Sequence, residues 1–326
     1  MRARLSAAAS LSASAVVLYF WINVISKAPL DIRSENTSLQ IEECQGFQSR
    51  LEQVRSGTFP TAPFNRSQLI PPFIEYAEQF HIAPPYHFLI CRIQKVMSTV
   101  LDAASCYISN STQFNASKRT ISTEKGGLNS FCRNQNIANN LAAALSAVKP
   151  PRHQLAVVRH PIEKFLSGFV DKCINTVRRD PTMCFSCKSD MSCFVHQLTK
   201  HLRKVHEKKE GKSYVGMHFS PQSWFCRFND TIDQFRIIKY RGGKEGAAYI
   251  AKEFSRVFRD AGLPENLRNE IFKEMLAGRS LHSTHGSEDR RKAEWTLMSN
   301  KTLLTEVVRL YYYDYVLFDY ELPSMF

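Results

Sequence analysis

Short apolar runs alternate with longer stretches of helical periodicity along most of the chain after residue 80. The runs 86–93, 153–160 and 235–240 are rich in Val, Ile, Leu and Phe, which predicts buried strands. The aromatic run 310–320 fits either a core strand or a core helix. Stretches with helical spacing are 99–108, 134–148, 161–173, 246–262 and most of the C-terminal third. Strands that alternate with helices predict an α/β domain with a central parallel sheet flanked by helices.

The first eighty residues follow another pattern. Residues 5–26 carry no charge, which predicts a signal-anchor helix long enough to span a bilayer, with the basic segment 1–4 left in the cytosol. A cleaved signal peptide is the alternative, because a basic start and an apolar core suit it too. Prolines interrupt 27–80, which predicts a stem and leaves 81–326 as a single luminal domain.

Two further features indicate a translocated domain. Nine cysteines suit an oxidising compartment. Six Asn-x-Ser/Thr triplets are acceptors for N-linked glycans, and they begin at Asn36, Asn65, Asn110, Asn115, Asn229 and Asn300.

The charge balance narrows the choice of partner. The chain has 43 Lys and Arg against 30 Asp and Glu, a net charge of +13. Such an excess favours nucleic acid, an anionic membrane or an acidic polysaccharide. In a secretory compartment nucleic acid is excluded, so we expect an acidic glycan. The basic stretch 200–212 is either a solvated surface or part of the surface that binds it.

Four cysteines cluster in the middle of the chain, at positions 173, 184, 187 and 193. A structural zinc site prefers two CxxC pairs, and only Cys184-x-x-Cys187 is present, so disulfides are favoured. Because nine is odd, at least one thiol is left over. We expect it to be Cys91, inside the first apolar run.

A candidate anion-binding turn follows that run, in the sequence RIQKVMST. A strand that feeds a helix through such a turn directs backbone N–H groups and the positive end of the helix to one point, where phosphate or sulfate binds. The glycines of the nucleotide-binding loop are missing, and an ordinary turn with a solvated lysine is the alternative. The expected binding residues are Arg92, Lys95, Val96, Met97, Ser98 and Thr99.

A second candidate lies in VVRHPIEKFLS. The strand 153–160 delivers Arg159 to its end, and Ser167 lies about two helical turns further on, so both can face one anion. A guanidinium fork with a hydroxyl suits a phosphate dianion. Alternatively, Arg159 pairs with Glu163 and Ser167 only packs.

Together the two segments resemble the carbohydrate sulfotransferases that use 3′-phosphoadenosine 5′-phosphosulfate (PAPS). The likeness is to the Golgi group that acts on chondroitin and dermatan, and to its nematode-rich branch. In that family a Lys followed by Ser/Thr wraps the 5′-phosphosulfate, which Lys95, Ser98 and Thr99 match. A second motif, R-[DH]-P-x-x-[RK]-[FL]-x-S, wraps the 3′-phosphate, and 159–167 match it. Val96-Met97 stand where small residues are common.

The resemblance implies a fold like that of the P-loop kinases and a Golgi membrane protein of single-pass type II. It implies transfer of sulfonate from PAPS, without a metal, to a glycan hydroxyl, most readily of a chondroitin-type glycosaminoglycan. Lys95 would stabilise the charge on the leaving oxygen. Arg290 and Arg291 would close over the nucleotide.

The acceptor hydroxyl needs a base near neutral pH, for which histidine is suited. His160, His218, His282 and His285 are candidates. We favour His218 as the catalytic base, because its loop GMHFSPQSWFC could hold a sugar ring.

Two other functions remain open from sequence alone. A metal-dependent glycosyltransferase is one, although the Asp-x-Asp expected of many such enzymes is absent. The other is a catalytically inactive luminal glycan-binding protein on the same scaffold.

Overall fold

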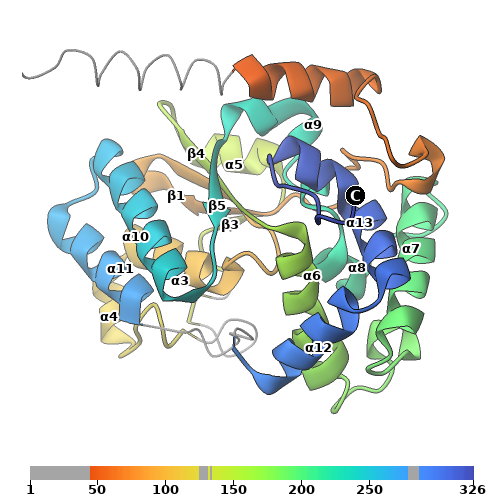
Figure 1. Cartoon of the computed structure of the whole chain (residues 1–326). Coiled ribbons are helices and arrows are strands. Elements are labelled where there is room, and N and C mark those ends of the chain that lie inside the picture. Colours follow the sequence, from red (N-terminus) through yellow and green to blue (C-terminus); the bar gives the residue numbers. More distant parts are fainter. Residues whose placement is uncertain (1–44, 125–130, 133, 278–285) are drawn as a thin grey trace, which may run out of the picture. The chain divides into compact units, whose positions relative to one another are not determined.

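The computed structural model describes residues 45–124, 131–132, 134–277 and 286–326 (Figure 1). The chain divides into two units, Met1–Ser49 and Arg50–Phe326, and the following concerns the second. The predicted cytosolic tail and signal-anchor helix lie outside the described residues. Within the described ranges, none of the helices has the length and apolar character needed to cross a membrane.

A five-stranded sheet lies at the centre of the second unit, in the order β3-β1-β2-β4-β5. Its strands are β1 (Phe80–Ala83), β2 (Phe88–Cys91), β3 (Ile137–Ala138), β4 (His153–Arg159) and β5 (Arg236–Tyr240). β2, β4 and β5 are parallel, whereas β1 is antiparallel to β2 and to β3. The prediction of a parallel sheet was therefore wrong for one edge. Only Pro84–Tyr86 and His87 join β1 to β2, and so short a link can connect only antiparallel strands.

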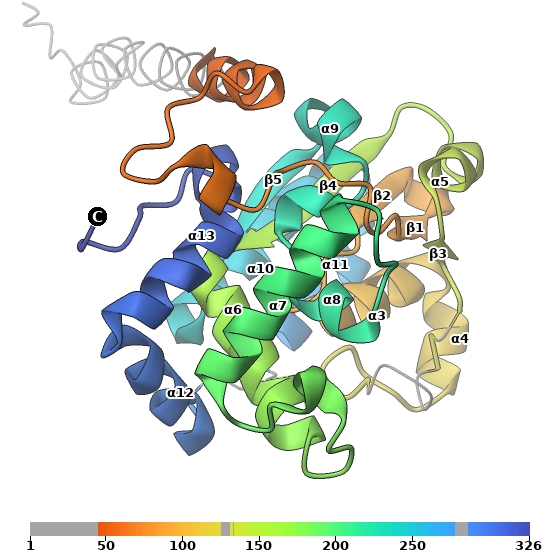
Figure 2. The ribbon, with the colours of Figure 1, turned by 90° about the vertical axis from the view of Figure 1, so that its right-hand side faces the viewer.

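Helices cover both faces of the sheet (Figures 1 and 2). One face carries α3 (Ser98–Ser109), α10 (Gly243–Asp260) and α11 (Glu265–Ala277). The other carries α6 (Pro161–Phe169), α7 (Met191–His206), α8 (Tyr214–Phe219), α12 (Glu288–Met298) and α13 (Lys301–Leu317). The chain thus leaves β2 toward one face and the adjacent β4 toward the other. In open α/β sheets ligands bind at such a switch point, beyond the carboxyl ends of the strands.

Most predicted elements are present with tighter bounds. The helix predicted over 134–148 is confined to α5 (Leu141–Ala147), because the Asn140 side chain caps it by accepting the N–H of Ala143 at 2.8 Å. The residues before that cap pair with β1 as β3. The aromatic run 310–320 falls mainly in α13, where Tyr311 and Tyr315 are buried. Two further short α-helices in the described part are α4 (Ser111–Ala116) and α9 (Phe228–Thr231).

Part of the predicted stem lies in the same unit as the sheet. Leu51, Leu69 and Tyr76 are buried, and the Tyr76 ring lies 5.7 Å from that of Trp224. Residues 50–80 therefore contribute to the hydrophobic core. The stem and domain boundaries drawn from the sequence stay a prediction.

Four disulfides join eight cysteines, and Cys44 lies outside the described residues. The pairs are Cys91–Cys226, Cys106–Cys132, Cys173–Cys184 and Cys187–Cys193. The preference for disulfides over zinc in the central cluster is confirmed. The prediction of a free Cys91 was wrong, because the turn after Trp224 runs beside the end of β2 and brings in a partner 135 residues away.

We expect the Cys91–Cys226 bridge to stabilise the fold more than Cys187–Cys193, because the two bridges span 135 and 6 residues. Loop-closure entropy gives roughly 5 kcal/mol for the long bridge and roughly 2 kcal/mol for the short one. Replacing both cysteines of each pair with alanine and measuring urea denaturation tests this. An equal or larger loss from the short bridge would contradict it.

Candidate active site

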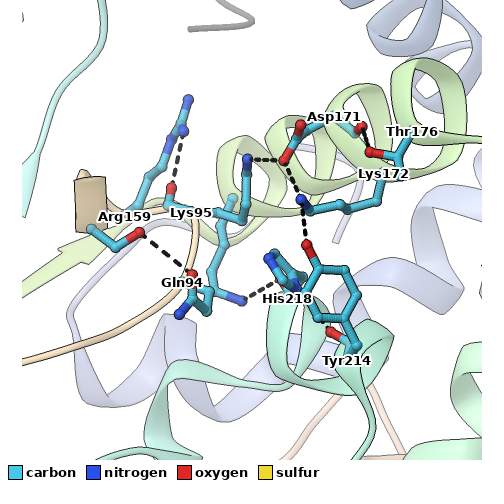
Figure 3. A network of polar contacts seen from close by, with 10 residues as sticks. Gln94, Lys95, Arg159, Asp171, Lys172, Thr176, Tyr214 and His218 are labelled. Carbon is cyan, nitrogen blue, oxygen red and sulfur yellow. Dashed lines mark hydrogen bonds and ion pairs between the residues drawn. The ribbon is translucent and has the colours of Figure 1, made fainter. Parts of the chain in front are cut away.

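The two predicted anion-binding segments lie side by side. β2 and β4 are paired in parallel, with Cys91 opposite Ala156, so their carboxyl ends open at the same edge of the sheet. Nη1 of Arg159, at the end of β4, donates a hydrogen bond to the carbonyl oxygen of Lys95 at 3.2 Å (Figure 3). The ends of the two strands are therefore neighbours.

The turn after β2 has a backbone suited to an anion. Lys95 and Met97 have φ values of 67° and 65°, an uncommon conformation for residues other than glycine. Met97 is the N-cap of α3, and its side chain does not cap the helix. The first N–H groups of α3 therefore have no capping side chain, and the positive end of the helix dipole adds to them. Val96 is fully buried, so its side chain points into the core and does not crowd this turn.

One carboxylate serves two ammonium groups at this turn. Oδ2 of Asp171 lies 2.8 Å from Nζ of Lys95 and 3.0 Å from Nζ of Lys172 (Figure 3). Burial alone would raise the pKa of Asp171, but Lys95 and then Lys172 lower it to about 2. Burial lowers the pKa of Lys95, and the attraction of Asp171 opposes that loss of charge. Asp171 therefore keeps two crowded lysines in place.

A second carboxylate, that of Glu163, also pairs with two cations, on the other side of the turn. Glu163 pairs with Arg159 at 3.2 Å and with Arg290 of α12 at 2.5 Å. Arg159 also lies over the Tyr240 ring at 4.9 Å. Nε of Arg290 also lies 3.7 Å from Oε2 of Glu294. Four cations thus face three carboxylates, which leaves one positive charge in excess. Nε of Arg159 and Nη1 of Arg290 are buried without a hydrogen-bond partner among the described residues.

Comparison with known proteins gives the family. The model of the sulfotransferase family matches residues 78–321. The chain belongs to the sulfotransferase family. The carbohydrate sulfotransferase chst-1 of Caenorhabditis elegans is 26% identical over 88% of this chain and 84% of its own length. An uncharacterized protein of the same species is 27% identical over 80% of this chain and 74% of its own. No solved structure matches.

The other residues predicted to bind the donor differ in where their side chains lie relative to the two strand ends. Ser98 and Thr99 begin α3, and Oγ of Ser98 lies 3.5 Å from the Gln94 side chain. Ser167 is buried in α6, the helix that begins beside Arg159. Arg92 is directed toward Gln79, to whose amide oxygen it donates a hydrogen bond at 2.8 Å. The binding roles of all these residues stay predictions.

His218 lies beside the lysine cluster (Figure 3). Its Nδ1 is 2.7 Å from the carbonyl oxygen of Tyr214. A carbonyl can only accept, so Nδ1 carries the proton and Nε2 keeps a lone pair. Burial lowers the pKa of His218 to about 3, and Lys172 and Lys95 add to the effect. The ring is therefore neutral at physiological pH, and an added proton there is costly.

The other histidines considered for the base are placed differently. His160 packs against the rings of Tyr315 and Tyr320, at 5.5 and 5.3 Å. His282 and His285 lie outside the described residues. Among the described candidates, only the ring of His218 lies in the polar network of Lys95, Asp171 and Lys172 drawn in Figure 3.

The sequence reasoning missed Asp171 and Lys172. They lie in a π-helical segment, Val170–Thr176, that continues α6, and such segments often occur at functional sites. Asp171 follows Ser167 by four residues, so extending the helical projection of the second motif by one turn would have placed it on the same face.

Lys164 was also missed, although it lies within the second motif. It is fully buried, and its Nζ donates to the carbonyl oxygens of His218 and Ser220 at 3.3 and 2.9 Å. Burial lowers the pKa of Lys164 to about 7, against the attraction of Asp314. Lys164 thereby fixes the chain that carries His218 to α6.

We expect His218 to make the fold sensitive to mild acid. Its pKa is about 3 in the folded chain and about 6.5 when unfolded, so unfolding takes up a proton between these values. Stability is then complete above pH 6.5 and falls as the pH drops. The free energy of unfolding of the wild type should therefore fall by about 1 kcal/mol more than that of His218→Asn between pH 6.5 and pH 5.5. Asparagine is chosen because its side chain can still donate a hydrogen bond to the carbonyl oxygen of Tyr214.

Urea denaturation at a series of pH values measures this difference. His196→Asn, at an exposed position on α7, is the matched control. Parallel pH profiles for the wild type and His218→Asn would contradict the prediction.

Proposed function

We propose that this sulfotransferase transfers the sulfonate group of PAPS to a hydroxyl of a glycan, with a chondroitin-type glycosaminoglycan as acceptor. The observation that supports it is the junction of two strand ends through Arg159 and Lys95, with cations in excess over carboxylates around them. An anionic nucleotide is attracted by that excess. The name of the relative chst-1, a carbohydrate sulfotransferase, supports a glycan acceptor.

The residues of the site fit the donor. The positive-φ turn and the uncapped start of α3 would hold the 5′-phosphosulfate, with Ser98 and Thr99 as hydroxyl donors. Arg159 and Ser167 would hold the 3′-phosphate, and the buried Nε of Arg159 is available for such a bond. The buried Val96 leaves the turn open, so the bulk at this position does not argue against binding.

When bound, PAPS would supply the sulfonate group. The bond between its sulfur and the phosphate oxygen breaks, and the electron pair stays on that oxygen. The acceptor oxygen forms the new bond to sulfur and loses its proton. Nζ of Lys95 is the donor positioned to stabilise the leaving oxygen. Asp171 holds this ammonium in place at 2.8 Å. Nε2 of His218 would take the acceptor proton, and because its pKa is about 3 it would do so only as the new bond to sulfur makes that proton strongly acidic.

We also propose that the domain lies in the Golgi lumen, anchored by the N-terminal segment. The five Asn-x-Ser/Thr asparagines within the described residues are all exposed, as glycosylation requires, namely Asn65, Asn110, Asn115, Asn229 and Asn300. Loss of apparent mass on treatment with an N-glycosidase, together with protease protection in intact Golgi vesicles, tests this location.

We expect Lys95→Ala to lower kcat for sulfonate transfer by about 10²- to 10³-fold, as for the loss of one transition-state donor. Transfer of labelled sulfonate from PAPS to desulfated chondroitin measures it. Lys273→Ala, at an exposed lysine of α11, is the matched control. Near-normal turnover in Lys95→Ala, with an unchanged melting temperature, would remove Lys95 from catalysis.

We expect Arg159→Ala to weaken the binding of adenosine 3′,5′-bisphosphate by about 10- to 100-fold, the loss of a charged hydrogen bond. Titration calorimetry measures the affinity. Arg236→Ala, at an exposed arginine of the adjacent β5, is the control. Unchanged affinity in Arg159→Ala would show that the nucleotide does not bind at the end of β4.

A further inference from the structure

We infer that Tyr214 and Lys172 form the subsite that binds an anionic sugar of the acceptor, an inference that rests on the proposed function. Tyr214 would stack on the ring of that sugar. Lys172 would pair with its carboxylate or sulfate group.

The two side chains are connected to Lys95 through the carboxylate of Asp171. Nζ of Lys172 donates a hydrogen bond to the hydroxyl of Tyr214 at 2.9 Å and lies 5.2 Å from the centre of its ring (Figure 3). The same nitrogen lies 3.0 Å from Oδ2 of Asp171, which holds Lys95. A ligand on Tyr214 would therefore lie next to the group that acts on the leaving oxygen.

The side chain of Tyr214 is exposed to solvent, although its hydroxyl group is bonded to Lys172. The residue keeps 52% of its surface accessible. The other large apolar residues exposed in the described part are Leu276, Trp295, Met298, Met325 and Phe326. Among the described residues, none of these makes a polar contact with Lys95, Asp171 or Lys172, so Tyr214 is the aromatic side chain that joins this network to solvent.

The fold holds Tyr214 rigidly. The preceding residue, Ser213, donates its backbone N–H to the Tyr76 hydroxyl at 2.9 Å, and its Oγ lies 2.9 Å from Nε2 of His201. The ring of Tyr214 lies 4.5 Å from that of His218. A ring fixed in this way loses little conformational entropy when a ligand stacks on it.

The charge beside the ring indicates the class of sugar. Burial opposes the charge of Lys172, but the Tyr214 hydroxyl and Asp171 raise its pKa above the ordinary value, so it stays protonated. Asp171 is shared with Lys95 and cannot neutralise both lysines. Lys172 therefore presents part of its positive charge beside the aromatic ring, where a uronic acid or a sulfated sugar supplies an anion and a neutral sugar does not.

Kinetics with two acceptors test the subsite. We expect Tyr214→Ala to raise KM about tenfold for both chondroitin and carboxyl-reduced chondroitin, and Tyr214→Phe to have a smaller effect. Lys172→Gln should raise KM about tenfold for chondroitin but less than twofold for the carboxyl-reduced polymer. KM for PAPS should stay within twofold in the two Tyr214 variants. Trp295→Ala and Lys273→Gln are the matched surface controls.

A binding measurement separates this inference from the proposed function. Calorimetry with a chondroitin hexasaccharide, in the presence of adenosine 3′,5′-bisphosphate, should show the same losses of affinity in Tyr214→Ala and Lys172→Gln. If the wild type transfers no sulfonate but these losses occur, the subsite stands and the enzymatic function fails. An unchanged melting temperature shows that each variant is folded.

Three results would overturn the inference. One is an unchanged acceptor KM and hexasaccharide affinity in Tyr214→Ala. Another is an equal effect of Lys172→Gln on both acceptors, since the lysine would then not read the carboxylate. The third is a rise in KM for PAPS alone, which would assign the pair to the donor.

Discussion

Repulsion between like charges is the constraint around which this site is built. Two cations about 4 Å apart repel by about 4 kcal/mol in a partly buried setting, so four cannot be held together at two adjacent strand ends without compensation. Asp171 and Glu163 supply it, each bridging two cations. With Glu294 also beside Arg290, the compensation is still incomplete, and the remaining positive charge favours an anionic ligand over a neutral one.

A further layer of buried groups fixes the geometry of these cations. The Gln222 side chain pairs with both the N–H and the carbonyl of Arg159, each at 2.8 Å. Asp314 of α13 is fully buried and accepts the backbone N–H groups of Gln222 and Ser223. Removing a buried charge of this kind leaves several donors unsatisfied, so its cost is large. The end of β4 is thus positioned by a residue more than 150 positions away.

Local patterns in the sequence predicted the elements that meet at the site. Features that depend on contacts between distant segments could not be predicted from such patterns. The apolar run before Lys95 and the Pro161 that begins α6 each define a strand end by themselves. β1 was missed because it has four residues and its pairing depends on the reversal that follows it. Cys91 was misjudged for a related reason, because burial in a strand does not reveal a partner that arrives from Cys226.

The missed polar residues share a different cause. Asp171 and Lys172 lie where α6 turns into a π-helical segment, and that change alters the direction of side chains relative to a regular helix. The Cys173–Cys184 bridge and the hydrogen bond from Thr176 to the Asp171 carbonyl hold this segment. Neither its conformation nor the approach of Tyr214 from α8 follows from periodicity.

The shared carboxylate of Asp171 has a consequence for how donor and acceptor sites relate. If the ammonium of Lys95 turns toward a leaving oxygen, Asp171 is left to pair with Lys172 alone, at 3.0 Å. That lysine is then held more firmly beside Tyr214, at the place proposed for the acceptor. Conversely, an anionic acceptor that draws on Lys172 leaves Asp171 to hold Lys95 in its charged form. One carboxylate between two lysines can therefore couple the two halves of the proposed site without any movement of the backbone.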